Sequence, residues 1–203
     1  MIGSEAHFRA TLSPERACGV LKSLVAACDT AQVICGREGL RQPLSQAQIA
    51  FDLASTCMDD AFDSDDGVRM SKVNGQVLWI VEEAYALRVK KLGPGYTPSN
   101  QSSGQQTRIS QQLSLDGMPP LVYLTAGTRY SAATGLPVEH VVVKHYPGKT
   151  GSLKAEWVVD LAELAAGALI ANAPSLLDHA PAIANPGAVV RSRRRQTTVE
   201  SGT

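Results

Sequence analysis

The chain has 203 residues, of which 44% are hydrophobic, 19% charged and only 5% aromatic, so a globally disordered protein is excluded. Its length suits one domain of ordinary size or two small ones. The net charge is zero, but it is unevenly distributed. The segment after residue 185 has a charge of +3 (four arginines and one glutamate), and the rest of the chain has a charge of −3 (15 basic and 18 acidic side chains). This distribution excludes a fold that is basic throughout.

The targeting signals and the cysteines favour a cytoplasmic protein, or a virion protein if it is viral. No basic segment followed by an apolar core opens the chain, so no signal peptide is expected. No uninterrupted apolar run reaches the roughly 18 residues of a membrane-spanning helix, so no membrane is expected as a partner. The four cysteines form no CxxC pair and have no histidine pair at zinc spacing, which predicts reduced, buried thiols without a metal.

The first part of the chain has the period of helices. Ser13 and Pro14 are typical of a helix start, and the apolar period that follows fades at Gly36. A capping box at 45–48 predicts a second helix. A third helix is predicted over 75–91, because apolar side chains recur on one face: Leu78, Val81, Tyr85 and Val89. This helix would end before a glycine and a proline.

Residues 93–107 are rich in turn formers and are predicted to be a linker. The apolar period then changes to two, which predicts strands at 109–115, 121–125, 138–143 and 157–159. Short turns at 116–117 and 147–151 separate some of these strands, so we expect an antiparallel meander.

A final helix is predicted over 161–171, capped by Asp160 and apolar nearly all round, and therefore buried against the sheet. Prolines then forbid regular structure although the segment stays apolar. The sequence thus predicts an α+β fold with a helical subdomain (1–92), a linker (93–107), a β-meander plus one buried helix (108–172), and an extended arm with a basic tail (173–203).

Two apparent ligand motifs do not match their patterns. Gly148-Lys149-Thr150 resembles the end of a phosphate-binding loop, but Val143 stands where the first glycine is needed, so a hairpin turn is favoured. The acidic run at 59–66 fails the EF-hand spacing and is predicted to be a solvated loop between helices. We therefore expect no cofactor and no bound metal.

The strand at 139–146 has the densest set of titratable groups. His140, Lys144 and Tyr146 alternate onto one face, and Glu139 and His145 onto the other. Histidines and a lysine on a sheet could perform acid/base cleavage of RNA, with Arg129 binding the phosphate. A half-exposed strand with one polar face is the structural alternative, and it is favoured.

The clearest local signal is a basic tail, Arg191, Arg193, Arg194 and Arg195. Guanidinium groups flanked by Ser, Thr and Gln suit phosphate binding through charge neutralisation, without base-specific contacts. A solvated tail, a nuclear-import signal and a kinase recognition sequence are the alternatives.

Together these features favour a structural protein over an enzyme, since no catalytic signature is found. The preferred hypothesis is an assembly protein resembling viral or phage shells in function, which forms homo-oligomers through its arm and contacts RNA or DNA without sequence preference. The alternatives are a small metal-independent ribonuclease using the strand from His140 to His145, and a protein-binding regulator.

Overall fold

The structure, a computed structural model, describes residues 2–40, 43–73, 76–98, 121–131, 133–148 and 153–171. Residues 1–172 belong to one compact unit, and residues 173–203 lie outside the described residues.

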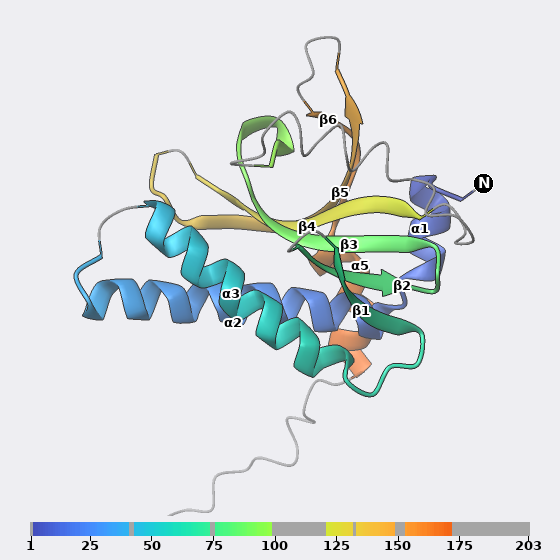
Figure 1. Cartoon of the computed structure of the whole chain (residues 1–203), viewed down its shortest axis with the longest axis horizontal. Helices are drawn as coiled ribbons and strands as arrows, with labels where there is room; N and C mark the ends of the chain where they lie inside the picture. The colour runs from blue at the N-terminus through green and yellow to red at the C-terminus, as the bar shows by residue number, and fades with distance from the viewer. Residues whose placement is uncertain are drawn as a thin grey trace, which may run out of the picture. The chain divides into compact units, whose positions relative to one another are not determined.

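The fold is α+β, with helices packed on one face of a six-stranded sheet (Figure 1). The helices are α1 (Glu5–Thr11), α2 (Pro14–Arg37), α3 (Pro43–Phe62) and α5 (Leu161–Ala171), and a short 3-10 turn, η1, spans Pro94–Tyr96. The strands are β1 (Val68–Val73), β2 (Gln76–Val81), β3 (Tyr85–Leu92), β4 (Val122–Tyr130), β5 (Pro137–Pro147) and β6 (Leu153–Asp160).

The strands lie side by side in chain order, from β1 to β6. All neighbouring pairs of the described sheet are antiparallel except β3 and β4, which run parallel with Tyr85 opposite Val122 and Leu92 opposite Arg129. A parallel pair needs a connection that returns to the start of the first strand, and residues 93–121 are long enough to make that return. The predicted meander is therefore correct for β4 to β6, and the sheet as a whole is mixed.

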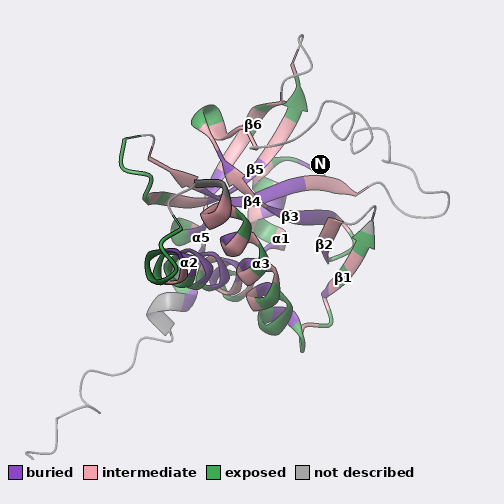
Figure 2. Cartoon of the chain, turned by 60° about the vertical axis from the view of Figure 1, so that its left-hand side comes forward, coloured by how far each residue is buried: buried purple, intermediate pink, exposed green. Residues whose placement is uncertain are grey.

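The main core lies between the sheet and the helices (Figure 2). Phe8 of α1 is fully buried there, stacked on Trp157 and in edge-to-face contact with Tyr85. A smaller cluster on the opposite face of the sheet contains Leu92, Val141 and Val143, and Tyr96 packs against it. The sheet is thus apolar on both faces in its centre.

The predicted helix over 75–91 is wrong, because these residues form β2 and β3. Their apolar side chains are buried on alternate faces, so the segment is apolar almost continuously and fits a helical period by chance. Glu82 and Glu83 make the turn between the strands with φ of 50° and 49°. The proposed helical subdomain, 1–92, therefore has three helices followed by three strands that belong to the common sheet.

Several helix boundaries were predicted correctly. The Ser13 hydroxyl accepts a hydrogen bond from the Arg16 amide, and the Asp160 carboxylate accepts one from the Ala162 amide. Helix α5 spans the predicted residues, but its buried side packs mainly against α2, and its other side is exposed. Helix α3 begins at Pro43, two residues before the predicted cap.

Helix α2 is long and apolar enough to cross a membrane by length and composition alone, a property that the search for uninterrupted apolar runs missed. The core helix of a soluble protein has the same composition, and nine residues of α2 are buried in the protein. Length and hydropathy therefore do not assign this helix to a membrane.

Candidate functional site

The basic tail, with Arg191, Arg193, Arg194 and Arg195, lies outside the described residues, as do the predicted strand at 109–115 and most of the predicted linker. Lys149 and Thr150 also lie outside them. The strands on either side, β5 and β6, form an antiparallel pair, so this stretch connects two strands and not a strand to a helix.

The acidic run contains two side chains with structural partners. Asp65 receives two hydrogen bonds from the Arg16 guanidinium, at 2.7 and 2.8 Å, and Arg16 also binds Glu82 at 2.6 Å. Asp59 accepts a hydrogen bond from the Trp79 indole at 2.9 Å. Within the described ranges no group of three or more potential ligands could hold a metal ion.

The two histidines of the 139–146 strand lie on opposite faces of the sheet. His140 faces the helices, where its Nδ1 lies 2.9 Å from the Thr128 hydroxyl. His145 follows a bulge in the pairing of β5 with β6, and its Nε2 donates to the Tyr96 carbonyl at 2.9 Å on the other face. Burial lowers the pKa of both imidazoles. One substrate therefore cannot contact both rings at once.

The remaining charged groups of this strand also have partners. Lys144 donates to the Gly3 carbonyl at 2.9 Å and to Glu156 at 3.0 Å, which fastens the N-terminal segment to the sheet. Arg129 forms an ion pair with Glu139, on the face opposite His140. Arg129 lies over the Tyr96 ring, on the same face of the sheet as His145. It can therefore lie near only one of the two histidines that the ribonuclease hypothesis uses.

In the structure, His140 lies beside a set of polar side chains that the sequence analysis did not predict as its neighbours. The Thr128 hydroxyl of β4 lies between the His140 ring and the Cys28 thiol of α2, 3.5 Å from the sulfur. The Tyr130 hydroxyl lies 3.2 Å from the same sulfur. These four residues are called the Cys28 cluster below; they come from α2, β4 and β5, so no local motif could have revealed them.

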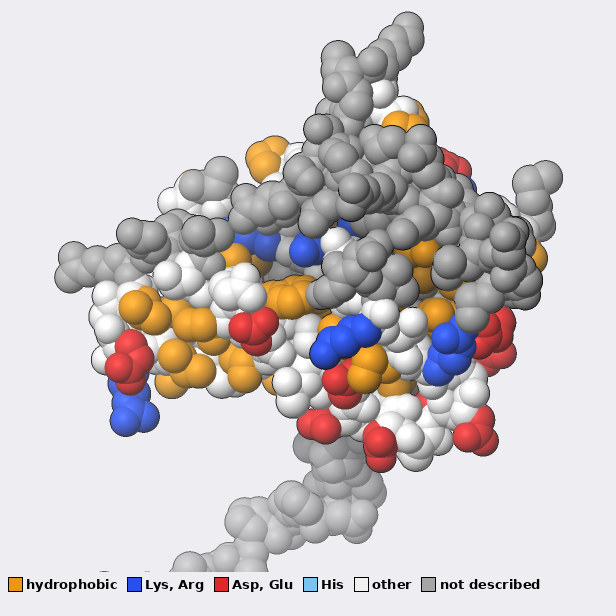
Figure 3. Space-filling model, in the orientation of Figure 1, with side chains coloured by type: hydrophobic (Ala, Val, Ile, Leu, Met, Phe, Trp, Pro, Cys, Tyr) orange, Lys and Arg blue, Asp and Glu red, His pale blue; other side chains and the backbone are white. Residues whose placement is uncertain are grey.

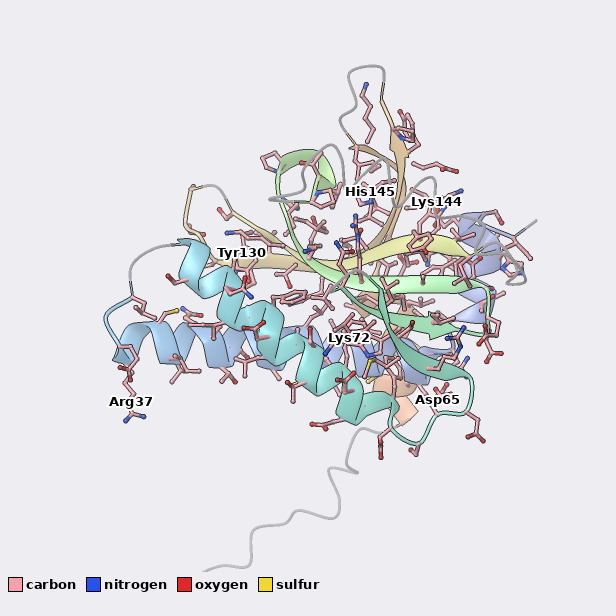
Figure 4. The ribbon with its side chains drawn as sticks, viewed as in Figure 1. Arg37, Asp65, Lys72, Tyr130, Lys144 and His145 are labelled. Carbon is pink, nitrogen blue, oxygen red and sulfur yellow. The ribbon has the colours of Figure 1, made fainter. Side chains whose placement is uncertain are left out.

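The Cys28 cluster lies at the end of the sheet that faces α2 and α3, and Figure 4 shows Tyr130 there, well separated from Lys144 and His145. Its burial is high: Cys28 is 5% exposed and Thr128 4%. Burial, and after it the contact with Cys28, raises the pKa of the Tyr130 phenol, so the phenol stays protonated and available as a donor.

A small recess opens beside the Cys28 cluster. Its walls include Cys28, Thr128 and Tyr130, together with Phe51 of α3 and the adjacent lysines of β3, Lys90 and Lys91. Each lysine ammonium lies over an aromatic ring, at 5.2 Å from the centre of Phe51 and 4.7 Å from that of Tyr130. The recess is partly open, and its cavity volume of about 20 Å³ has room for a molecule near the size of water.

On the other face of the sheet, Arg88 is 5% exposed and donates to the Thr125 hydroxyl at 3.2 Å. Burial lowers the pKa of Arg88 to about 10. The group therefore stays positively charged at neutral pH, in the interior of the sheet.

Comparison of the chain with protein-family models, with curated proteins and with solved structures finds no match.

Proposed function

We propose that the protein is a structural, self-associating assembly protein that contacts nucleic acid through the arginines of its tail. The observation that carries the proposal concerns the arginines outside the tail and the groups that surround them. In the described part of the body every arginine is either paired with a carboxylate or buried in the sheet. This state of the described arginines supports phosphate binding by the tail.

The paired arginines show a common pattern, in which each guanidinium is held by acidic side chains of the same chain. Arg16 is the firmest, bound to two carboxylates and only 16% exposed. Arg37 is the loosest, 84% exposed and 3.6 Å from its partner (Figure 4). The pairs are Arg9 with Glu5 and Glu163, Arg16 with Asp65 and Glu82, Arg37 with Glu38, Arg69 with Glu83, and Arg129 with Glu139.

The charge distribution supports the same assignment. A guanidinium that already neutralises a carboxylate gains less from a phosphate, because it must give up that partner. The tail has four arginines against Glu200 alone, so its charge is available for counterion release. The acidic body and basic tail also favour contact through the tail over contact through the whole surface.

The self-association part of the proposal is supported by exposed apolar side chains. Val33 of α2 is 69% exposed, Leu40 just after it 41%, and Val138 of β5 52%. Hydrophobic side chains gather along α2 and α3 in Figure 3. The arm at 173–190 adds further apolar residues without a helical or strand period: Leu176, Leu177, Ile183, Val189 and Val190. Apolar surface of this kind is stabilised when copies of the chain bury it against one another.

A salt titration tests the nucleic-acid contact. Binding of a random RNA or DNA oligomer is measured by fluorescence anisotropy for the wild type and for a variant with Arg191, Arg193, Arg194 and Arg195 changed to Ala. Four phosphate contacts predict a log–log slope for the wild type of about −3.6 on duplex DNA and about −2.8 on a single strand, and a much flatter slope for the variant.

The matched control removes four charges from the body instead. Lys22, Arg37, Lys72 and Lys154 are all exposed, and changing them to Ala gives the same net charge as the tail variant. The proposal requires the control to bind nearly as the wild type does. Equal loss in both variants would show a general charge effect, and no wild-type binding at about 50 mM salt would remove the nucleic-acid role.

The assembly role is tested by light scattering on the full chain and on a chain that ends at residue 173. Particles larger than a monomer are expected for the full chain, and smaller ones after the arm is removed. A monomeric full chain, or a particle whose size does not depend on the arm, would contradict self-association through this segment.

A further inference from the structure

We propose that Cys28 is a reactive thiol that is oxidised by hydrogen peroxide in the recess between α2, α3 and β4, with Thr128 and His140 as the route by which its proton leaves. This inference is independent of the proposed function, because it rests on the Cys28 cluster and not on the tail or the arm.

Hydrogen bonds connect the Cys28 sulfur with the His140 imidazole through the Thr128 hydroxyl. Tyr130 can donate to the sulfur at 3.2 Å, the thiol to the Thr128 hydroxyl at 3.5 Å, and that hydroxyl to Nδ1 of His140 at 2.9 Å. This chain of donors ends on an imidazole that is neutral at neutral pH, since burial lowers its pKa. The imidazole is therefore in the form that accepts a proton.

Charged side chains lie near both ends of this hydrogen-bonded set. Asp29 of α2 and Asp160 of β6 lie close enough to His140 to oppose the effect of burial on its pKa and to favour the imidazolium once it forms. At the other end, Lys90 and Lys91 line the same recess as the sulfur. Reactive cysteines are typically found beside cations and hydrogen-bond donors, because the thiolate is the reactive form.

The recess beside Cys28 is small and partly open. Its cavity volume of about 20 Å³ has room for a molecule near the size of water, and hydrogen peroxide is such a molecule. The hydroxyls of Thr128 and Tyr130 can bind the peroxide oxygens. Hydrogen peroxide can therefore approach Cys28 from the recess that this residue lines.

The reaction balances without a further reagent. The Cys28 proton passes to Thr128, whose own proton passes to His140. The thiolate attacks one peroxide oxygen, the S–O bond forms as the O–O bond breaks, and the departing hydroxide takes the proton back from His140 to give water. The sulfur loses two electrons to become a sulfenic acid, and the peroxide is reduced by the same two electrons.

Helix α2 supplies internal controls for the test. Cys18 and Cys35 are 5% and 7% exposed, close to the 5% of Cys28, whereas the described residues around them form no hydrogen bond with either thiol. They lie ten and seven residues from Cys28 on one helix, about 15 and 10 Å along its axis, so neither can form a disulfide with it. The three cysteines are thus buried to the same degree and differ in their polar surroundings.

The experiment exposes the folded full-length protein to hydrogen peroxide, stops the reaction with catalase, and denatures the chain in an alkylating reagent. Peptide mass spectrometry then gives the fraction of each cysteine that has lost its thiol. Cys28 is expected to react at least about tenfold faster than Cys18 and Cys35. Thr128→Val and His140→Gln should each slow Cys28 to within about twofold of the other two.

Equal oxidation rates at the three buried cysteines in the wild type would overturn the inference, as would a Cys28 rate that neither variant lowers. The rates at Cys18 and Cys35 in the same sample show whether each variant keeps a native core. Two variants are used, so that loss of folding in one leaves the other to decide.

Discussion

Replacing Gly127 by alanine should strongly destabilise the protein. Gly127 lies opposite Lys90 in the parallel ladder between β3 and β4. A Cβ atom at this position would lie 2.1 Å from the Lys90 carbonyl oxygen and 2.9 Å from Cγ of Leu92, both well inside ordinary van der Waals contact. Because the nearer atom belongs to the backbone, no side-chain rotation relieves the clash, and the two strands must separate.

The size of the effect follows from this geometry. Forcing an extra methyl group into a packed interior costs about 1–3 kcal/mol, and a clash with backbone belongs at the upper end of that range. A loss of about 3 kcal/mol in a unit of this size lowers the melting temperature by roughly 6–12 °C.

The measurement is urea unfolding followed by the fluorescence of Trp79 and Trp157, which both contribute to the main core. Gly36→Ala is the matched control, because a Cβ there meets nothing within 4 Å and the residue is in helix α2. The control should stabilise the protein by about 0.5–1 kcal/mol. A Gly127→Ala variant within about 0.5 kcal/mol of the wild type would refute the reasoning.

Three further predictions concern the core, a helix cap and an ion pair. Phe8→Ala should reduce the free energy of unfolding by about 3–5 kcal/mol in urea, since the ring is fully buried. Asp160→Ala should reduce it by about 1 kcal/mol, because the cap of α5 is lost. The hydrogen bonds from Arg16 lower the pKa of Asp65 in the folded state. The contribution of this ion pair to the free energy of unfolding is therefore complete above the unfolded pKa of Asp65, about 3.9. It is lost as the pH falls through the lower pKa of Asp65 in the folded state. Melting temperatures from pH 6 to pH 2.5 should fall less steeply for Asp65→Asn than for the wild type; equal slopes would contradict this assignment.

The elements that the sequence predicted well are those defined by local chemistry. Ser13 and Asp160 are helix caps in the structure as predicted, because capping depends on neighbouring amides alone. The alternation that placed His140 and His145 on different faces of one strand also holds, since it follows from the pleat.

The errors arose where tertiary burial changed the apolar pattern. Strands β2 and β3 have buried side chains on both faces, for example Trp79 and Ile80. Apolar and polar residues therefore do not alternate along these strands, and their apolar residues also fit the period of a helix. The position of Cys28 beside Thr128 and His140 could not be predicted either. Their sequence separations are 100 and 12 residues, and they meet only because α2 crosses the end of β4 and β5.

The parallel junction of β3 with β4 also has a consequence for biosynthesis. Strands β1 to β3 and β4 to β6 can each pair with near neighbours as they emerge, but the junction between the two sets is a contact of high sequence separation. At the usual rate of translation, roughly 2–7 s pass between the synthesis of Leu92 and that of its partner Arg129. During that interval the edge of β3 that will bind β4 is unpaired, and it can pair with the same edge of another nascent chain. On a polysome the unpaired edge of β3 is therefore a point at which copies of the protein can mispair.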